Sequence, residues 1–593
     1  MRMPALACSL IIRGMTDHER GESPAAGGNA IARPTGIDQF LSELCVAFFS
    51  MEIALRSEIP TYAGGLGALA GDTLRTAADL RVPLVGVTLV SRAGYFRQEL
   101  DASGRQLEHP APWDPARWAS RLDAKAAVRI EGRSVWIGAW LYVIESRLGG
   151  LAPVILLDTD LPENEAGDRE ITHYLYGGDD AYRLKQEMVL GMGGVRILHA
   201  LGFRVSEYHM NEGHSALLGV ELLRRNAYAP EDIRPGEPAY DLPRVRRRCR
   251  FTTHTPVEAG HDRFAYDLVA RLFASVPIDL TLLRGLGGAD ILNMTRLGLN
   301  LSDFVNGVAK RHAEISQGMF PGYQVRAITN GVHPYTWTAE SFRALYDRYV
   351  PGWLVEPELL VRADAIPAEA LIEAHESAKR ALIERVRALV GVGLDARKPI
   401  LGFARRMTAY KRPDLLFSDL ERLRRIARQA PLQIVLAGKA HPRDEDGKRL
   451  IALLHEHARA LAGAVPVVYL PDYDLALAQL VVAGADVWLN TPLPPFEASG
   501  TSGMKAAFNG VPSLSVPDGW WIEGCIEGVT GWSVADAESL YDKLEHIVLP
   551  LYYRRASDPA GWVGVMQGTI TKSGAYFNSH RMMRRYATEA YLR

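Results

Sequence analysis

The sequence has few cysteines, no long apolar run and almost no net charge. Its four cysteines are Cys8, Cys45, Cys249 and Cys525, and no CxxC pair occurs among 593 residues. A disulfide framework is therefore not indicated, and a reducing, cytoplasmic setting is expected. No run of about 20 apolar residues appears, so no membrane-spanning helix is predicted. Lysine plus arginine (67) nearly cancels aspartate plus glutamate (69), so nothing points to nucleic acid or an anionic membrane.

Length and N-terminal composition suggest how the chain is divided. A chain of 593 residues is too long for one hydrophobic core, so two or more domains are expected. The apolar stretch at residues 6–12 is too short and too weakly flanked for a signal peptide. Residues 13–36 are rich in glycine, alanine, proline and charge. We expect residues 1–40 to form a disordered N-terminal extension.

Hydrophobic runs alternate with helical periodicity in two successive sets. In the first set, a buried strand at 44–52 precedes a glycine loop, a helix from 72 to about 81 and a strand at 82–90. This order is the β-loop-α-β unit of a parallel sheet. Further strands are predicted at 153–158, 205–211 and 250–255, with a helix at 183–201. The second set of strands is predicted at 399–404, 432–437, 465–470 and 487–490.

The two sets predict an α/β fold of two doubly wound, Rossmann-like domains that face a central cleft. We place the domains at residues 41–385 and 386–593, with the helical pattern of 367–391 linking them. The final helical pattern, at 580–592, is expected to pack back on the N-terminal domain. Ligands of such folds bind at the carboxyl ends of the strands.

Two segments that follow predicted strands have the composition of anion sites. The loop at 64–67 (GGLG) precedes a helix, and its backbone N–H groups and the helix N-terminus attract an anion. Residues 405–412 (RRMTAYKR) place four cations directly after a strand, where they suit an oxyanion. The respective alternatives are a tight turn without a ligand and a solvated basic turn. The basic run at 244–248 precedes a strand, and we interpret it as a solvated face.

Two segments carry paired histidines, at 209–214 (HMNEGH) and 254–261 (HTPVEAGH). Their spacings put no histidine pair on one helical face, as a helical zinc motif does. Both segments lie at predicted strand ends. We therefore predict no metal, and expect hydroxyl contacts or structural hydrogen bonds instead.

The segment at 491–512 carries the strongest signal. It runs from a strand through a proline-rich approach and a small-residue turn into a short helix that contains Lys505. A lysine just inside a helix start opposes the helix dipole, which favours anions there. This conflict suggests a special role or a bound anion. A buried lysine has a lowered pKa, which is what imine formation with an aldehyde requires.

Residues 497–505 (EASGTSGMK) closely resemble the cofactor-attachment segment of the glycogen and maltodextrin phosphorylases. The similarity extends in order over most of residues 45–535. The other matching stretches are 64–67 (GGLG), 211–214 (NEGH), 253–255 (THT), 305–312 (VNGVAKRH), 329–337 (TNGVHPYTW), 405–412 and Tyr473. This resemblance implies an α-glucan phosphorylase of glycosyltransferase GT-B architecture that uses pyridoxal 5′-phosphate (PLP).

The resemblance also implies a role for each matching residue. The catalytic residues would be Lys505, which holds PLP as a Schiff base, Arg406, Lys411 and His254. The other cofactor ligands would be Thr501, Ser502, Arg405, Trp337, Tyr473, Gly64 and Gly65. Substrate phosphate would be held by Arg406, Lys411 and the amide of Gly65. The glucosyl unit would be bound by Asn330, His254, Glu497, Ser499 and Gly500, with His214 in a supporting role.

The family chemistry implied here is retaining phosphorolysis of a terminal α-1,4-linked glucose of glycogen or maltodextrin. The substrate phosphate protonates the glycosidic oxygen and attacks from the same face, giving α-glucose 1-phosphate. Cations and helix N-termini offset the repulsion between the two phosphates. No carboxylate pair at glycosidase spacing is then needed, so Glu497 would be a sugar ligand rather than an acid.

The sequence departs from the long animal and plant forms at three places. Arg405 stands where they have lysine, and Thr408-Ala409 stands where they have His-Glu. Arginine still binds phosphate, although its geometry differs from that of lysine. The large insertion that they carry between residues 187 and 211 is missing, so their dimer contacts and allosteric sites are not carried over. Residues 519–524 (GWWIEG) resemble the short bacterial or archaeal branch.

Two other functions are compatible with parts of the pattern. A nucleotide-sugar glycosyltransferase, such as a glycogen or starch synthase, shares the architecture and a GGLG loop but does not need Lys505. A non-catalytic glucan-binding protein would be expected to lose Arg406, Lys411 or Lys505, and all three are present.

Overall fold

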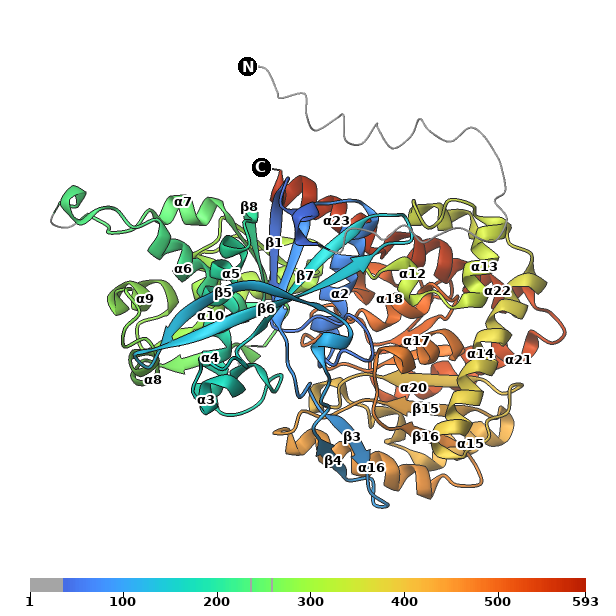
Figure 1. Cartoon of the computed structure of the whole chain (residues 1–593). Coiled ribbons are helices and arrows are strands. Elements are labelled where there is room, and N and C mark those ends of the chain that lie inside the picture. Colours follow the sequence, from blue (N-terminus) through green and yellow to red (C-terminus); the bar gives the residue numbers. More distant parts are fainter. Residues whose placement is uncertain (1–35, 235–236, 258–259, 593) are drawn as a thin grey trace, which may run out of the picture. The chain divides into compact units, whose positions relative to one another are not determined.

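A computed structural model describes residues 36–234, 237–257 and 260–592, and shows a mixed α/β fold with two large, mainly parallel sheets (Figure 1). The expected disordered extension lies outside the described residues except at its end, where Ile37–Phe40 forms a 3-10 helix. No helix within the described ranges is long and apolar enough to cross a membrane.

The first sheet has nine strands in the order β13-β12-β9-β8-β1-β2-β7-β6-β5. Their bounds are β1 (Leu44–Ser50), β2 (Leu84–Leu89), β5 (Ser120–Ile130), β6 (Arg133–Glu145), β7 (Leu151–Asp158), β8 (Arg204–Asn211), β9 (Cys249–Thr252), β12 (Phe304–Gly307) and β13 (Arg326–Ala327). The predicted strands all occur, although β9 stops at Thr252 rather than at 255. The antiparallel pair β5 and β6 was not predicted, because strands were placed on continuous apolar runs and these two strands alternate exposed and buried residues.

The second sheet is parallel, with the order β16-β15-β14-β17-β18-β19. Its strands are β14 (Ile400–Ala404), β15 (Gln433–Ala437), β16 (Val467–Leu470), β17 (Val487–Asn490), β18 (Ser513–Ser515) and β19 (Gly531–Ser533). The first four were predicted. The last two are three residues each, which is too short to give a hydrophobic period.

Helices flank both sheets. They are α2 (Gly65–Asp79), α3 (Ala166–Arg169), α4 (Asp180–Met188), α5 (Gly194–Ala200), α6 (Leu217–Arg225), α7 (Leu242–Arg247), α8 (Tyr266–Leu272), α9 (Leu280–Gly287), α10 (Met294–Asn300), α11 (Lys310–Met319), α12 (Pro334–Trp337), α13 (Glu340–Tyr349), α14 (Ala368–Val390), α15 (Leu420–Gln429), α16 (Glu445–Ala460), α17 (Leu475–Gly484), α18 (Ser502–Ala507), α19 (Trp521–Gly524), α20 (Ala537–Lys543), α21 (Leu549–Arg554), α22 (Ala560–Gly568) and α23 (Ser579–Tyr586). A separate antiparallel pair is formed by β10 (Arg263–Ala265) and β11 (Ile291–Asn293). A π segment (Val189–Gly193) joins α4 to α5 and makes the predicted helix at 183–201 nearly continuous.

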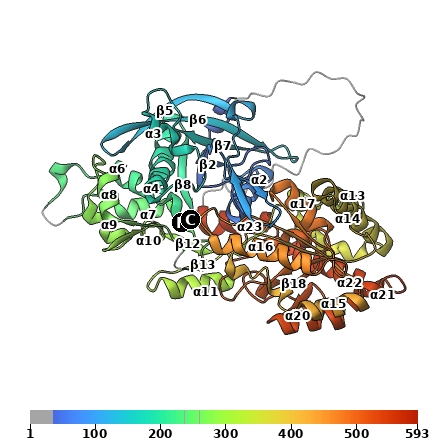
Figure 2. The same cartoon turned by 90° about the horizontal axis from the view of Figure 1, so that it is seen from below.

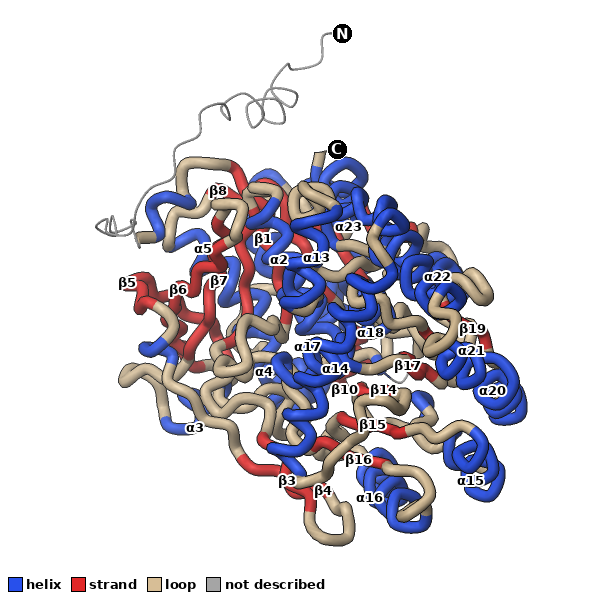
Figure 3. The backbone as a smooth tube through the Cα atoms, turned by 90° about the vertical axis from the view of Figure 1, so that its right-hand side faces the viewer, coloured by secondary structure: helices blue, strands red, loops and turns tan. Residues whose placement is uncertain are grey.

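Two consecutive residues of β2 show how the helices cover both faces of the first sheet. A Cβ on Gly86 would lie 2.9 Å from Leu74 of α2, whereas Val87 lies against Gly194 of α5. Successive strand residues face opposite sides, so α2 and α5 cover opposite faces. In the second sheet, α14 packs along α17, and a Cβ on Gly484 would lie 2.6 Å from Leu382 (Figure 3).

The helix after the glycine loop begins earlier than predicted. We expected it at residue 72, but α2 begins at Gly65, so Gly67 and Gly71 are helical residues. The glycines inside it are required by close packing. A Cβ on Gly67 would lie 2.6 Å from Glu52 Oε2, and one on Gly71 would lie 2.2 Å from the Ala54 carbonyl.

The C-terminal helical segment, α23 followed by a π segment (Ala587–Tyr591), contacts strands of the first sheet (Figure 2). The Tyr591 hydroxyl lies 2.6 Å from His209 Nδ1, and Arg250 Nε donates to the Ala590 carbonyl at 2.5 Å. The Ser579 amide also donates to the Val332 carbonyl. The C-terminal helical segment thus contacts both the strands of the first sheet and the loop at 328–333, which precedes α12.

A buried cluster of Asp79, His333 and His580 reinforces this junction. Asp79 Oδ2 lies 2.8 Å from His333 Nε2 and 2.9 Å from His580 Nε2, and the three ligand atoms lie within 4.8 Å of one another. The two histidines lower the pKa of Asp79 against the effect of burial. Because each histidine already lies at hydrogen-bond distance from Asp79, we interpret the cluster as a hydrogen-bonded junction.

A hairpin after β2, formed by β3 (Arg97–Leu100) and β4 (Gln106–His109), contacts the loop after β15. Gln98 Nε2 donates to the Gly438 carbonyl at 3.0 Å, and Gln106 Nε2 donates to the Ala440 carbonyl at 2.9 Å. Both glutamines are buried. These bonds connect the β3–β4 hairpin, which follows β2 of the first sheet, to the carboxyl edge of the second sheet.

Candidate functional site

Lys505 lies in α18, which follows β17 after the loop at 491–501, and is buried. Its Nζ sits 3.9 Å from the centre of the Trp337 ring, and Trp337 Nε1 donates to Asp72 Oδ2 at 2.7 Å. Burial lowers the pKa of Lys505 to about 8, although Asp72 acts in the opposite direction. A neutral amine is therefore accessible near physiological pH, as the sequence reading required for a reactive lysine.

The turn before Lys505 is held in place by backbone and hydroxyl contacts. Trp488 Nε1 on β17 donates to Ser502 Oγ at 3.0 Å, and the Lys505 amide donates to the Thr501 carbonyl. Gly500 has a φ of +77°, a conformation that favours glycine. The first N–H groups of a helix have no partner within the helix, so those of α18 suit an anion.

Three charged residues form a buried cluster directly beside this turn. Lys411 Nζ donates to both oxygens of Glu497 at 2.7 and 2.6 Å, and Arg405 Nη2 donates to Glu497 Oε2 at 2.6 Å. Burial alone would raise the pKa of Glu497, but the two cations outweigh it and lower that pKa to about 2. The Glu497 amide donates to Asp518 Oδ2 at 2.9 Å, which fixes the backbone. We call Arg405, Lys411 and Glu497 the charge cluster.

Arg406 and Tyr473 lie around the charge cluster without joining it. Arg406 is exposed, and its Nη2 donates to the Tyr410 hydroxyl at 3.3 Å. Tyr473 is partly buried, and burial raises the pKa of its phenol while nearby Arg405 lowers it. Arg406 is thus the cation of this loop that remains open to solvent for an incoming anion.

The glycine loop is organised by Glu52, which the sequence reading did not single out. Glu52 Oε2 accepts hydrogen bonds from the amides of Ala63 at 2.6 Å and Gly64 at 3.0 Å, and Oε1 accepts one from Tyr176 at 3.0 Å. Glu52 is buried and follows the carboxyl end of β1. The Gly65 amide, the first of α2, is not used by Glu52.

His254 follows β9 and is held by the two residues at the end of β8. Its Nε2 lies 2.7 Å from Asn211 Oδ1, and its amide donates to Glu212 Oε2 at 2.6 Å. Burial lowers the pKa of His254 to about 3, so the ring is neutral. Burial also raises the pKa of Glu212 to about 7 against the donors that bind it. Glu212 has a φ of +74°, a strained conformation for a residue with a side chain.

His214 belongs to a separate ionic group, and no hydrogen bond between it and His254 occurs in the described part of the chain. Its Nε2 lies 3.5 Å from Asp262, which accepts a hydrogen bond from Arg183 at 2.8 Å. Burial lowers the pKa of His214 to about 3. The supporting role expected for His214 is therefore a structural one in this arrangement.

Several predicted ligand residues carry buried polar atoms that have no hydrogen-bond partner in the described part of the chain. They are Asn330 Oδ1, Ser499 Oγ, and Arg405 Nε and Nη1. Buried polar groups are rarely left unsatisfied without a bound partner or a functional reason. These atoms fit a site that receives an oxyanion and hydroxyl groups.

The structure arranges the predicted residues in two groups, each at the carboxyl edge of one sheet. The first-sheet group comprises Gly64, Gly65, His254 and Asn330; the second-sheet group comprises Arg405, Arg406, Lys411, Tyr473, Glu497, Ser499, Gly500, Thr501, Ser502 and Lys505. Trp337 joins them, since it follows the Asn330 loop and contacts Lys505. No direct hydrogen bond between His254 and the second group occurs among the described residues.

The sequence reading missed Glu52, Asp72, Glu212 and Asp518. Glu52 and Glu212 could have been found as acids at strand ends. Asp72 had no local signal, because its partner Trp337 is 265 positions away.

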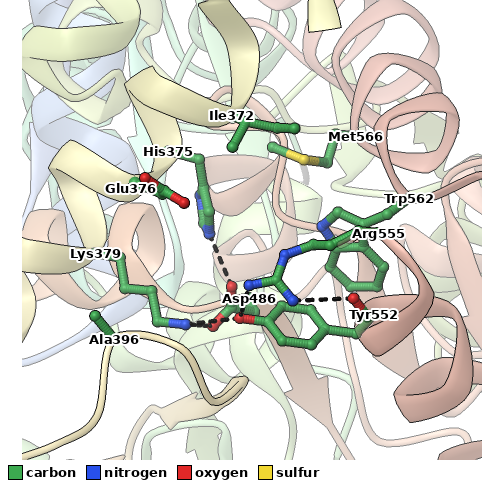
Figure 4. A pocket seen from close by; sticks show the side chains of 10 residues that line it. All are labelled: Ile372, His375, Glu376, Lys379, Ala396, Asp486, Tyr552, Arg555, Trp562 and Met566. Carbon is green, nitrogen blue, oxygen red and sulfur yellow. Dashed lines mark hydrogen bonds and ion pairs between the residues drawn. The ribbon is translucent and has the colours of Figure 1, made fainter. Parts of the chain in front are cut away.

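A separate cavity of about 20 Å³ lies beside Asp486 and is distinct from this site (Figure 4). Asp486 accepts from Lys379 Nζ at 2.7 Å and from the Ile400 amide at 2.7 Å, and lies 3.1 Å from His375 Nε2. Ile400 begins β14 and Asp486 precedes β17, so this ionic group is at the amino edge of the sheet. A cavity of this size holds about one water molecule, so we assign it a structural role.

Comparison with known proteins gives consistent matches. A family model described as carbohydrate phosphorylase matches residues 280–529. A maltodextrin phosphorylase of Thermococcus litoralis is 38% identical over 598 residues, covering 92% of this chain and 70% of the relative. A glycogen phosphorylase of Mycobacterium tuberculosis is 36% identical, covering 96% and 72%. A glycogen phosphorylase of Aquifex aeolicus is 35% identical, covering 92% and 86%.

Proposed function

Because the chain belongs to the carbohydrate phosphorylase family, we propose that it is an α-glucan phosphorylase. It transfers the terminal α-1,4-linked glucose of glycogen or maltodextrin to inorganic phosphate and releases α-D-glucose 1-phosphate with retention. The partners are thus the glucan, phosphate and glucose 1-phosphate. We place the reaction in the cytoplasm.

The observation that carries the proposal is Lys505, buried against Trp337 with a lowered pKa, next to a charge cluster that has unsatisfied donors. These residues fit PLP. Lys505 would hold its aldehyde carbon, and Trp337 and Tyr473 would pack around its ring. Thr501, Ser502 and Arg405 would bind its phosphate. When bound, PLP supplies a phosphate group that faces the substrate phosphate.

The charge cluster together with the neighbouring Arg406 explains how two phosphates could be tolerated side by side. Arg405, Arg406 and Lys411 supply three positive charges, and Glu497 supplies one negative charge. A phosphate that takes over Lys411 and Arg405 would release the oxygens of Glu497, which could then accept hydrogen bonds from glucose hydroxyls. Glu497 would therefore exchange a cation partner for a sugar partner on binding. While Lys411 and Arg405 remain beside it, its low pKa keeps it ionised and therefore a hydrogen-bond acceptor.

The sugar side of the site would be formed from the first sheet. Asn330 Oδ1 is a free acceptor, and Ser499 Oγ and the amide of Gly500 approach from the second sheet. The Gly65 amide, at the start of α2, would bind the substrate phosphate through the helix N-terminus. Gly64, whose amide already binds Glu52, would then position the loop rather than bind the cofactor directly.

We further propose the GT-B arrangement of two Rossmann-like domains, residues 41–385 and 386–593, with reactants between the two carboxyl edges. Support comes from Trp337, which contacts Lys505, and from the Thr329 hydroxyl, which donates to Glu523 at 2.9 Å.

Phosphate-dependent release of glucose 1-phosphate from maltoheptaose or glycogen tests the activity, and phosphopyridoxal released by acid tests the cofactor. Lys505→Ala should lose both together, whereas Lys125→Ala, an exposed lysine paired with Glu163, should keep both. Turnover by Lys505→Ala would contradict the assigned role. PLP content without phosphorolysis would favour a non-catalytic glucan-binding protein. A protein that lacks PLP and uses a nucleotide sugar would be a glucan synthase instead.

A further inference from the structure

His254 is the proposed sugar ligand on the first sheet, and its usefulness depends on which ring nitrogen carries the proton. A neutral imidazole donates from one nitrogen and accepts at the other. Nδ1 of His254 has no hydrogen-bond partner among the described residues, whereas Nε2 faces Asn211 Oδ1 at 2.7 Å. The residue bound to Nε2 therefore determines whether Nδ1 is a hydrogen-bond donor or an acceptor for a ligand.

A chain of hydrogen bonds sets the orientation of the Asn211 amide. The Ser50 hydroxyl donates to the Glu52 carbonyl at 2.8 Å, so its proton is committed. Ser50 Oγ can then only accept from Asn211, and Asn211 Nδ2 donates to it at 3.0 Å. The amide oxygen of Asn211 must consequently face His254. An amide oxygen accepts and cannot donate, so Nε2 of His254 carries the proton.

The surroundings of the ring keep it neutral, so the other nitrogen stays a lone-pair acceptor. Burial lowers the pKa of His254 to about 3, and His312, His209 and His214 act in the same direction. The backbone is fixed independently, because the His254 amide donates to Glu212 Oε2 at 2.6 Å. The ring of His254 is thus fixed through Nε2 and its backbone through the amide, while Nδ1 has no hydrogen-bond partner among the described residues.

We propose that Asn211 is a positioning residue that locks His254 in its Nε2-protonated tautomer and so presents Nδ1 as an acceptor for a glucose hydroxyl. Asn211 itself does not touch the substrate. This inference rests on the proposed function for the identity of the ligand, but the tautomer is a property of the protein alone. It assigns a specificity role to the strand end at β8, since only a ligand that donates a hydrogen bond there is accepted.

Two variants separate this role from a merely structural one. Asn211→Ala removes the hydrogen bonds to both Ser50 and His254, and the loss of the bond that fixes the His254 ring should lower kcat/KM about 10- to 100-fold at every pH. In Asn211→Asp the carboxylate still accepts from Nε2, so kcat/KM at pH 8 should recover to within about 5-fold of wild type. The added charge raises the pKa of His254, typically by 1 to 3 units next to an opposite charge. An acid limb should therefore appear in the pH profile of this variant alone, because His254⁺ donates at Nδ1.

The tautomer can also be read without activity. In protein labelled with ¹⁵N-histidine, long-range proton–nitrogen NMR spectra distinguish a protonated from an unprotonated ring nitrogen, and His254 is assigned by the signal missing in His254→Asn. Wild type should show a protonated Nε2 and a bare Nδ1. The opposite tautomer, or wild-type kcat/KM in Asn211→Ala, overturns the proposal. So does equal loss in both variants at every pH. If wild type shows the expected tautomer but no phosphorolysis, the proposed function is contradicted and the proposed role of Asn211 in setting the tautomer is not.

Discussion

The charge cluster gives a stability prediction that can be worked from the structure. Glu497 is buried between Lys411 and Arg405, and its pKa falls from 4.5 to about 2. A difference of this size corresponds to about 3 kcal/mol of stabilisation at neutral pH. Because the folded pKa is the lower one, this contribution is present above pH 4.5 and is lost as the pH falls from 4.5 toward 2.

Glu497→Gln removes the charge while keeping the shape of the side chain. Two buried cations then lose their counter-ion, which typically costs about 3–5 kcal/mol. With about 2.1 cal/mol/K of unfolding entropy per residue, 3 kcal/mol lowers Tm by about 3 °C if about 550 residues unfold together. The decrease is about 7 °C if about 200 residues unfold separately. Melting is followed by circular dichroism at pH 7 in a buffer without phosphate.

A second arm of the same experiment tests the proposed phosphate site. Phosphate should raise Tm more in Glu497→Gln than in wild type, because Lys411 and Arg405 no longer have a competing carboxylate. Glu538→Gln is the matched control, since this exposed acid lies 2.7 Å from Arg422 and a surface pair contributes at most about 1 kcal/mol. If both variants melt within 1 °C of wild type, the cluster does not stabilise the fold as argued. An unchanged response to phosphate would refute anion binding there.

Three further predictions concern other parts of the molecule. Uptake of PLP by the apo-protein, followed by absorbance, should rise with pH with a midpoint near 8, since the neutral amine of Lys505 becomes available as the pH passes its lowered pKa. A midpoint near 10.5 would mean that burial does not lower the pKa of Lys505. Gly67→Ala should reduce kcat/KM at least 10-fold because its Cβ would lie 2.6 Å from Glu52 Oε2, whereas Gly285→Ala, at a helical glycine of α9 with nothing within 4 Å, should stay within about 3-fold; equal values would show that the loop absorbs the clash. Asp486→Asn should destabilise by about 3–5 kcal/mol in urea unfolding, because Lys379 is left buried without its counter-ion, while kcat at 20 °C is retained; a loss of activity without loss of stability would contradict a structural role.

Most of the parallel strands could be predicted from the sequence, because a strand buried on both faces reads as a continuous apolar run. β1 and β14 are of this kind, with nearly every residue buried. β5 and β6 were missed because their exposed faces interrupt the apolar run, although alternation of apolar and polar residues is itself a strand signal. The start of α2 was placed too late, because glycines are poor helix formers and the packing that makes them necessary is not local.

The candidate site was predicted as a set of residues but not as a set of contacts. The motif at 497–505 identified Lys505 and Glu497, yet Glu497 was expected to face sugar and instead pairs with Lys411 and Arg405. The motif indicates the role of Glu497 when the glucan is bound. Its pairing with Lys411 and Arg405 follows from the need of a buried carboxylate for nearby positive charges.

The sequence by itself determined the alternation of strands and helices, the lysine at 505 and the cations after β14. These are local patterns, written within a few residues of each other. Only the tertiary structure decided that Asp72 supports Trp337 beneath Lys505, that Glu52 holds the glycine loop, and that Asn211 orients His254. Each of these contacts joins residues from different strands or helices, and a side chain's proton and charge depend on such neighbours rather than on its position in the chain.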